Sequence, residues 1–563
     1  MKTILVCCET GCRANGAGAV AEALKEQVAL LQADAEVQAD TGVGMDAAAS
    51  TTDSASESAG SGLATATVKE TGCIGFCGHG PLVRIMPDDI SYYRVRPKDA
   101  PEIVQSLGRE PVARLLYRDA DGSRKRCQHE HPFYSPQKKL ALRNVGLIDP
   151  GDLDDARAEG VYTALARALA MTPEAIISEV ERSGLRGRGG AGFLTGHKWR
   201  SAAAAAGVPK YVIMNGDEGD PGAFMDRSML EGDPHSVLEG IAIAALAIGA
   251  EQGYLYIRDE YTHALAAVRR AIADAEAAGI LGDSILGSGR PLHLSVVRGG
   301  GAFVCGESSA MIASIEGNVG EPRGKYVRST EEGLWGQPTV MNNVETFINI
   351  PLILNGSGAA FAQLGTEKSK GTKVFALVGK IRRSGLVEVP MGTTLRQIVF
   401  DIGGGVPRGR AFKAIHAGGP SGGCLPESEL DLPVDFDSLT SHGSMMGSGG
   451  LVVMDDATCM VESARYNVEF LARESCGKCV PCREGLRWLL RILTRICNGQ
   501  GRPEDIGLIK EICTTLTLAS RCGLGKTAAN PVLSTIRYFA DEYTEHIEHQ
   551  HCAAGVCQMG VKK

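Results

Sequence analysis

This chain of 563 residues has few aromatic residues, no excess of basic over acidic residues, and no long apolar runs. The net charge of −8 leaves no basic excess to neutralise phosphates, so neither a nucleic-acid backbone nor an anionic membrane is an expected partner. No stretch of about 18 uninterrupted apolar residues occurs, so a membrane-spanning helix is not expected. The first residues hold one lysine and an apolar run too short for a signal peptide, and they predict a first strand.

Glycine and cysteine are abundant instead. The 71 glycines, beside only 5% aromatic residues, favour a chain with many tight turns and cofactor loops. The 17 cysteines, without a secretion signal, predict a reducing compartment, with the cytoplasm as the default, and ligation of metals or clusters instead of disulfides. The length predicts roughly three to five domains.

The first 108 residues predict a small thioredoxin-like domain of order β-α-β-β-β-α. The expected strands and helices cover residues 2–6, 18–32, 63–69, 82–86, 91–95 and 97–107. Residues 41–62 are rich in Ala, Ser, Thr and Asp and contain no aromatic residue. They cannot bury enough surface to offset their ordering entropy, so we expect a mobile insertion there.

The rest of the chain divides into four segments by composition and periodicity. Residues 109–150 are polar and irregular and predict a segment that crosses between domains. Residues 151–365 alternate helix and strand, which predicts an α/β layer with parallel strands. Residues 366–455 predict a small β-rich module with a helix at 395–402, and residues 456–563 are mostly helical by spacing.

The strongest motif lies in the last segment. Cys476, Cys479 and Cys482 have C-x2-C-x2-C spacing, which lets one loop wrap three corners of a [4Fe–4S] cubane. Cys522, between an arginine and a glycine, is the natural fourth ligand. Zinc is the alternative, although zinc sites usually use two separated C-x2-C pairs. Chance clustering of core cysteines is the third interpretation.

A second quartet lies at the amino end. Cys7 and Cys12 follow the first predicted strand, and Cys73 and Cys77 follow the third element. Two short-spaced pairs from neighbouring loops suit a [2Fe–2S] cluster, with each pair holding one iron. Cys8 is a spare that replaces Cys7 in an alternative spacing. A redox dithiol, or the remnant of a lost cluster site, explains the same pattern.

A glycine-rich stretch at 184–193 contains a G-x-G-x-x-G match. A predicted helix precedes it, so it is not an ordinary dinucleotide fingerprint. Its backbone N–H groups can still face a phosphate, and Arg186, Arg188 and Lys198 supply cations. The loops 215–222 and 299–307 each follow a predicted strand, at the edge where open α/β sheets bind ligands.

Together, GLRGRGGAGF, NGDEGDPG, GAFVCGES, GLWGQPTVMNNVET, ESCGKCVPCREG and RCGLGKTAANP resemble the FMN-bearing, NADH-oxidising subunit of respiratory complex I. The resemblance extends to its soluble relatives, the beta-type diaphorase subunits of NAD-dependent formate dehydrogenases and bifurcating hydrogenases, over roughly residues 125–557. The amino-terminal quartet resembles the thioredoxin-like [2Fe–2S] domain fused to some of them. The implied fold is multidomain α/β, with a Rossmann-like FMN domain, a ubiquitin-like β-grasp (SLBB) domain and a C-terminal helical bundle carrying [4Fe–4S].

The resemblance also implies site residues, in three groups. The FMN site would comprise Gly187, Arg188, Gly189, Gly190, Lys198, Asn215, Asp217, Glu218, Gly306, Glu307, Asn342, Asn343 and Thr346. The nucleotide site would comprise Phe193, stacked on the adenine, with Asp220, Phe303 and Lys325. A zinc site would comprise Cys459, His546, Cys552 and Cys557, with His549 and His551 as alternatives.

Several positions depart from the family pattern, and all lie on the nucleotide side. Ser308 replaces an acid, Ser201 and Arg328 replace aromatic residues, and Asp220 replaces a longer acid. Residues 326–330 replace the sequence PPFPA. The site loses acidic and aromatic groups and gains an arginine, which would either admit the 2′-phosphate of NADP or weaken NAD binding. We retain NAD as the expected nucleotide.

The implied activity is that of an NADH dehydrogenase or NAD reductase. Hydride would pass between NAD(H) and FMN, and single electrons would pass through iron–sulfur clusters to or from a partner. The expected partners are a small thioredoxin-like [2Fe–2S] subunit and a catalytic subunit such as a formate dehydrogenase or hydrogenase, in a hetero-oligomer without nucleic acid or membrane insertion. One alternative is a flavin electron-transfer or bifurcating subunit that does not itself use NAD(H); another is a structural subunit with vestigial cofactors.

Five further cysteines receive simpler interpretations. Cys127 begins a C-x-H-x-H pattern with His129 and His131, which we attribute to a polar crossing loop. The other four are expected to be small buried residues: Cys305, Cys424, Cys497 and Cys513.

Overall fold

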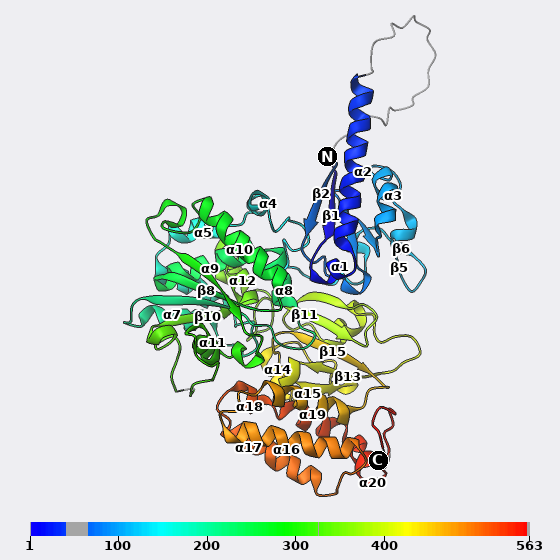
Figure 1. Cartoon of the computed structure of the whole chain (residues 1–563), viewed down its shortest axis with the longest axis vertical. Helices are drawn as coiled ribbons and strands as arrows, with labels where there is room; N and C mark the ends of the chain where they lie inside the picture. The colour runs from blue at the N-terminus through cyan, green and yellow to red at the C-terminus, as the bar shows by residue number, and fades with distance from the viewer. Residues whose placement is uncertain (1, 41–65, 325, 560–563) are drawn as a thin grey trace, which may run out of the picture. The chain divides into compact units, whose positions relative to one another are not determined.

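The computed structural model describes residues 2–40, 66–324 and 326–559 (Figure 1). It divides into two compact units, Met1–Ser135 with Asn144–Asp149, and Pro136–Arg143 with Pro150–Lys563. The expected mobile insertion at 41–62 and the expected nucleotide residue Lys325 lie outside the described residues. Among the described helices, none combines the length and apolar character that crossing a membrane requires.

The first unit contains a four-stranded sheet of order β2-β1-β3-β4. The bounds are β1 Lys2–Cys7, α1 Thr10–Ala14, α2 Ala17–Asp40, β2 Ala66–Thr71, β3 Leu82–Met86, β4 Ile90–Tyr93 and α3 Ala100–Gln105. β1 pairs parallel with β2 and antiparallel with β3. Helix α2 buries Val20, Leu24 and Val28, which recur every four residues along one face. The predicted order of strands and longer helices is confirmed, and the structure adds α1, a short helix that the sequence did not predict.

Residues 113–135 belong to this first unit. They form η3 Ala113–Leu115, the short strands β5 Tyr117–Arg118 and β6 Arg124–Lys125, and η4 Gln128–Glu130. Phe133 stacks on Phe76 with ring centroids 4.7 Å apart, and His131 lies edge-on to Phe76 at 5.0 Å. Because Phe76 lies in the loop between Cys73 and Cys77, the segment covers that cysteine loop.

The second unit begins with a parallel sheet of order β10-β7-β8-β9. Its strands are β7 Lys210–Gly216, β8 Ala250–Arg258, β9 His293–Gly299 and β10 Thr339–Asn343. Its helices are α4 Leu153–Ala158, α5 Thr163–Leu169, α6 Pro173–Ser183, α7 Thr195–Ala204, α8 Met225–Gly232, α9 Pro234–Ile248, α10 Thr262–Ala277, α11 Ser308–Ile315, α12 Val344–Asn355 and α13 Gly358–Phe361. Every residue of α9 is buried, so this apolar helix forms part of the core. The predicted parallel α/β layer is confirmed.

A five-stranded sheet of order β12-β11-β15-β13-β14 follows. The bounds are β11 Thr372–Gly379, β12 Gly385–Pro390, β13 Phe412–Ala417, β14 Gly423–Pro426, α14 Phe436–Ser441 and β15 Gly450–Asp455. The helix expected at 395–402 is a π-helix, η8 Gln397–Ile402. The buried Glu388 carboxylate of β12 accepts hydrogen bonds from the backbone of residues 140–142, which fastens that segment to the sheet.

The carboxyl-terminal part is helical, as predicted, and is drawn in orange to red in Figure 1. Its helices are α15 Met460–Glu474, α16 Val480–Cys497, α17 Asp505–Ala519, α18 Gly523–Thr527, α19 Asn530–Tyr538 and α20 Ala540–Glu548. Leu486, Leu489 and Leu493 of α16 are fully buried at three- and four-residue spacing, and Leu516 of α17 lies in the same core. This packing holds the ends of α16 and α17 near the cysteine motif.

Candidate functional site

The glycine-rich loop between α6 and α7 folds back on itself. Gly187 N donates to Phe193 O at 2.8 Å, and Arg188 N donates to Thr346 Oγ1 at 2.9 Å. A Cβ at Gly189 would lie 3.1 Å from Asn343 Cβ. Gly190 has φ +115°, and a Cβ there would lie 3.2 Å from the Gly447 backbone. The loop therefore needs glycine for both conformation and space.

The ends of two neighbouring parallel strands meet this loop. Asn215 at the end of β7 is in register with Asn343 at the end of β10. Asn215 Nδ2 donates to Gly306 O at 2.9 Å, and its Oδ1 accepts from Asp217 N at 3.1 Å. The structure thus brings residues 187–190, 215–217, 306 and 343–346 to one edge of the sheet, where such sheets bind ligands.

Two carboxylates at this edge differ in their partners. Asp217 Oδ2 is buried and has no hydrogen-bond partner among the described residues, whereas Oδ1 lies 3.3 Å from Arg258 Nη1. Burial raises the pKa of Asp217 to about 7. Glu218 instead accepts from Asp226 N, Arg227 N and a tyrosine hydroxyl. Asp217 is therefore the carboxylate with capacity left for a ligand.

The expected cations are already engaged with the protein. The buried Arg188 guanidinium donates to Arg186 O at 2.8 Å and to Lys370 O at 2.6 Å. Lys198 Nζ donates to Met341 O at 2.8 Å, and burial of the ammonium lowers the pKa of Lys198 to about 8. A lysine with three N–H donors keeps two for a further acceptor, while the Arg188 side chain holds the loop in shape.

Glu307 and Asn342 also serve the local structure. Glu307 Oε2 accepts from Ser309 N at 2.9 Å and from Ala310 N at 3.1 Å, which caps α11. Asn342 Oδ1 accepts from the indole N–H of Trp199 at 3.0 Å. The amide N–H₂ of Asn342 and the second oxygen of Glu307 are the groups with remaining capacity.

The expected nucleotide residues lie in different environments. Phe193 is 59% exposed, whereas Asp220 is half-buried and accepts from Ser448 Oγ at 2.5 Å. Phe303 packs edge-on against Phe470 with centroids 5.3 Å apart. A Cβ at Gly219 would lie 2.6 Å from the Phe303 ring, so the Asp220 loop and Phe303 are adjacent.

Two residues that depart from the family pattern, Ser201 and Arg328, are associated with the loop 316–333. Ser201 Oγ on α7 lies 2.9 Å from the hydroxyl oxygen of Thr330 in the 316–333 loop. Arg328, in the same loop, has a side chain 74% exposed, and its Nη1 lies 4.0 Å from Glu331. This loop therefore presents the exposed guanidinium of Arg328 two residues before Thr330, which contacts Ser201.

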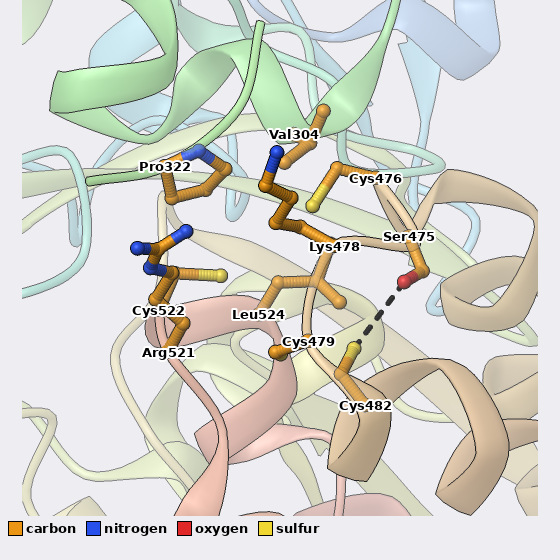
Figure 2. A pocket seen from close by; sticks show the side chains of 10 residues that line it. All are labelled: Val304, Pro322, Ser475, Cys476, Lys478, Cys479, Cys482, Arg521, Cys522 and Leu524. Atoms are coloured by element: carbon orange, nitrogen blue, oxygen red, sulfur yellow. Dashed lines mark hydrogen bonds between the residues drawn. The ribbon is translucent and has the colours of Figure 1, made fainter. Parts of the chain in front are cut away.

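The four cysteines of the carboxyl-terminal motif line one cavity (Figure 2). Cys479 precedes α16, Cys482 lies in its first turn, and Cys522 precedes α18. Val304, Pro322 and Leu524 give the cavity an apolar wall, and Ser475, Lys478 and Arg521 give it a polar one. Four thiols around one small space fit a cubane cluster.

Sequence reasoning did not assign three side chains at this cavity. Ser475 Oγ lies 3.3 Å from Cys482 Sγ (Figure 2) and accepts from Gly477 N at 3.2 Å. Glu474 Oε2 accepts from Phe303 N at 2.9 Å, which ties the cysteine loop to the loop that follows β9. Lys478 pairs with Glu321. The one feature of the sequence that could have indicated a role for these three residues is that each lies within two positions of Cys476.

In the first unit, the structure brings the amino-terminal quartet together. Cys73 Sγ lies 3.6 Å from Cys77 Sγ. Hydrogen bonds with the thiols of Cys12 and Cys73 hold the pKa of Cys7 well below its usual range. A Cβ at Gly80 would lie 2.8 Å from Cys12 Sγ, so this glycine leaves room for the thiol. The thiol of the spare Cys8 instead forms a hydrogen bond with Glu70.

The tail brings together Cys459, His546, Cys552 and Cys557, whose candidate ligand atoms all lie within 4.8 Å of one another. Cys459 Sγ lies 3.4 Å from His546 Nε2 and 3.7 Å from Cys557 Sγ. His546 Nδ1 lies 2.7 Å from Glu542 O, an arrangement that fixes the ring and leaves Nε2 for a metal. Neither alternative histidine belongs to this group.

The four cysteines expected to be plain core residues are all buried: Cys305, Cys424, Cys497 and Cys513. Cys497 has a further feature, because its thiol lies beside the tail site, close to the Glu462 carboxylate and the Cys557 thiol.

Two family models match the second unit. Residues 180–352 match the Nuo51 FMN-binding domain, and residues 462–546 match the NADH-ubiquinone oxidoreductase-F iron–sulfur binding region. These spans contain the glycine-rich loop, the strand ends and the four cysteines of the cavity.

Known relatives and a solved structure point to the same family as these two domain matches. The chain is 50% identical over 421 residues to the NADP-reducing hydrogenase subunit HndC of Solidesulfovibrio fructosivorans, covering 75% of this chain and 86% of that one. It is 46% identical over 414 residues to an F-type subunit of the NADH-quinone oxidoreductase of Rhizobium meliloti, covering 73% and 98%. A crystal structure of NAD+-reducing [NiFe]-hydrogenase in the H2-reduced state matches with TM-score 0.65 at 28% identity, covering 97% of this chain and 84% of that one. The resemblance drawn from the motifs is confirmed: the chain belongs to the family of FMN- and iron–sulfur-binding subunits that includes the F-type subunits of NADH-quinone oxidoreductase.

Proposed function

We propose that this chain is a diaphorase subunit, which transfers hydride between NAD(H) and FMN and exchanges single electrons with a partner subunit. One observation carries the proposal. Three loops converge on an edge of the parallel sheet with a buried, unsatisfied Asp217 oxygen, and the same compact unit holds four cysteines around one cavity. FMN, when bound, accepts a hydride and releases its electrons one at a time to iron–sulfur centres.

Different residues at the sheet edge would bind different parts of FMN. The backbone at Gly187, Gly189 and Gly190 would face the FMN phosphate, with Lys198 as the available cation. Asn215, Asp217 and Gly306 would line the flavin side, and Asn342, Asn343 and Thr346 the phosphate end, while Glu218 and Glu307 shape the loops. No side chain needs to act as nucleophile or general base; the chain orients the flavin and excludes water.

Two clusters and a zinc ion complete the proposal. Cys476, Cys479, Cys482 and Cys522 would hold [4Fe–4S]; Cys7, Cys12, Cys73 and Cys77 would hold [2Fe–2S] in a thioredoxin-like domain; and Cys459, His546, Cys552 and Cys557 would hold zinc. The parallel-sheet region would be the Rossmann-like FMN domain, and the five-stranded region the SLBB domain.

The partners follow from the names of the relatives, which are subunits of larger enzymes. We expect a small thioredoxin-like [2Fe–2S] subunit and a catalytic subunit, a hydrogenase or a formate dehydrogenase, in a hetero-oligomer. Seventeen cysteines favour a reducing compartment such as the cytoplasm.

A second candidate function uses NADP(H) in place of NAD(H). It is favoured by Ser308 in place of an acid and by the exposed guanidinium of Arg328 on the 316–333 loop. The relative from Solidesulfovibrio is named as NADP-reducing. If neither NADH nor NADPH bleaches the bound flavin, the chain would instead be an electron-transfer subunit that does not itself use a nicotinamide nucleotide.

The decisive experiment uses the full chain purified anaerobically. FMN, iron and sulfide are quantified, and flavin bleaching is followed during titration with NADH and, separately, with NADPH. Gly190→Ala should lose FMN, because its Cβ would press on the Gly447 backbone. Gly279→Ala is the matched control: Gly279 also has positive φ, but its Cβ would meet nothing within 4 Å. A colourless wild-type chain without FMN, iron or sulfide would overturn the proposal.

A further inference from the structure

Two distant segments of the first unit meet at the turn between β3 and β4. Asp89 lies in this turn with φ +54°. Its Oδ1 accepts from Arg84 Nε at 2.7 Å, and its Oδ2 accepts from Gln128 N at 3.2 Å. Ser91 N donates to Arg126 O at 2.9 Å, so the backbone of the two segments is also joined. The carboxylate is thus held in a fixed position beside residues 126–130.

Cys127 and His129 lie on the same side of this junction. The Cys127 thiol, the His129 ring and the Asp89 carboxylate offer ligand atoms that all lie within 4.8 Å of one another. His129 Nδ1 is 3.5 Å from Asp89 Oδ2. We propose that Asp89, Cys127 and His129 form a binding site for a divalent metal ion of the zinc type, separate from the other cysteine sites.

The ligand types define the class of metal. A thiolate, an imidazole and a carboxylate together suit zinc and similar borderline ions, whereas magnesium and calcium take oxygen ligands. Three protein ligands leave the fourth tetrahedral position for water or a neighbouring group. The His129 side chain is 75% exposed, so the fourth position is reachable from solvent.

Sequence spacing suggested a different third ligand. In the C-x-H-x-H pattern, the natural partner of Cys127 and His129 is His131. The structure buries His131 completely, with its ring 4.0 Å from that of Tyr117. Asp89, which is 38 positions before Cys127 in the sequence, takes its place in the group.

The proposed ion would fasten the segment that covers the cysteine loop. His131 and Phe133 follow directly after the ligands and pack on Phe76, between Cys73 and Cys77. Joining Cys127 and His129 to the β3–β4 turn restricts the start of this cover. The ion would therefore act as a clip on the aromatic cover, without taking part in electron transfer.

The test uses the full holoprotein and zinc chloride as the probe. Cys127 is alkylated with iodoacetamide with and without Zn²⁺, and its modification is followed by peptide-resolved mass spectrometry. Zinc should slow alkylation at Cys127 in the wild type by about tenfold or more, because the thiolate is the nucleophile that iodoacetamide consumes and a thiolate bound to zinc is withheld from it. Asp89→Asn and His129→Gln should each abolish this protection.

The variants are chosen to keep the fold. Asn tolerates the left-handed backbone of position 89, and His129 is exposed, so neither change disturbs packing. His293→Gln is the matched control, because His293 Nε2 also lies 3.5 Å from a carboxylate, that of Asp283, but belongs to no group with a cysteine among the described residues. Protection of Cys127 that is absent in the wild type, or unchanged in His129→Gln, would overturn the proposal.

Discussion

Lys478 Nζ lies 2.7 Å from Glu321 Oε2, which pairs a cation between two cavity cysteines with a carboxylate from the 316–333 loop. The loop continues through Pro322, which lines the same cavity, to Arg323, whose N–H donates to Ser309 Oγ at 2.9 Å. Ser309 in turn contacts Glu307 at the sheet edge. A continuous set of contacts thus joins the cysteine cavity to the proposed flavin site.

Glu321→Gln should raise the midpoint potential of the [4Fe–4S] centre. The substitution leaves the Lys478 charge uncompensated beside the cluster, and a positive charge favours the reduced form. The shift should be roughly 10–40 mV if the interaction of the changed charge with the cluster has the size of a half-exposed charge pair, about 0.2–1 kcal/mol, since 59 mV corresponds to 1.4 kcal/mol for one electron. An anaerobic redox titration followed by electron paramagnetic resonance measures it, and Lys478→Met should shift the potential downward. An upward shift in both variants would contradict this account.

Ser475→Ala should lower the same potential. In a loaded site the Cys482 thiolate is an acceptor, so the Ser475 hydroxyl 3.3 Å away would donate to it and stabilise the reduced cluster. Ser520→Ala is the matched control, since the buried Ser520 hydroxyl has no hydrogen-bond partner among the described residues. The same redox titration distinguishes them: equal potentials in Ser475→Ala and the wild type would exclude a role for this hydrogen bond.

Local patterns in the sequence predict most of the regular structure. Strands such as β7 and β8 are short apolar runs after helices, and period and length suffice to place them. The convergence of Asn215 and Asn343 also follows from sequence, because parallel strands end at one edge. For residues 113–135 the sequence predicts only a crossing segment. Tyr117 and Phe133 lie in two short apolar runs separated by a long polar stretch, and no periodicity reveals that both rings pack on Phe76.

Contacts between distant segments carry no comparable signal. The contacts of Asp89 with Cys127 and of Glu321 with Lys478 depend on how whole elements pack. The residues next to Asp89 and Glu321 in the sequence form no motif that would indicate these contacts. Arg188 illustrates a related difficulty. A glycine-flanked arginine is typical of a phosphate ligand, yet backbone carbonyls engage its guanidinium in the folded chain.

Lys373→Met should destabilise the second unit by about 3–5 kcal/mol. Lys373 and Glu345 form a fully buried ion pair between β11 and α12, and removing the ammonium group leaves the Glu345 carboxylate with only the more distant Arg188, whose Nε lies 4.0 Å away, as a counter-charge. Adding Glu345→Gln should restore much of the loss, because glutamine is neutral and its carbonyl can still accept from Val374 N. Chemical unfolding of the single and double variants measures this; equal stability of the two would contradict it.

Glu239→Gln should remove part of the pH dependence of stability. Burial raises the pKa of Glu239 to about 7, so the folded chain holds this proton more tightly than the unfolded chain does. The resulting stabilisation is complete below the unfolded value near 4.5 and is lost as pH rises through 7. Gln retains an acceptor for Leu165 N, so the variant should match the wild type at pH 4 and exceed it by roughly 2–4 kcal/mol at pH 8.

Unfolding at several pH values measures this difference. Glu251→Gln serves as the control, because Glu251 is exposed and its carboxylate is solvated in the folded and unfolded chain alike. A Glu239→Gln variant that is less stable than the wild type at pH 8 would show that the carboxylate is stabilising when ionised.

Chelation of zinc should loosen the carboxyl-terminal tail. Cys459 caps the start of α15, whereas His546 lies on α20 and Cys552 and Cys557 lie beyond it. An ion bound to all four therefore joins the residues after α20, which form no helix or strand up to residue 559, to a buried helix end. Without the ion, hydrogen exchange should increase in α20 and in residues 549–559.

The histidine variants make this prediction specific. His546→Gln should lower the zinc content measured by plasma mass spectrometry and raise exchange in the tail, because Nε2 of His546 lies among the thiols. His551→Gln should do neither, since the exposed His551 ring contacts Glu545 and lies outside the ligand group. If His551→Gln loses zinc while His546→Gln retains it, the ligand set is wrong and the tail binds its ion through the later histidine.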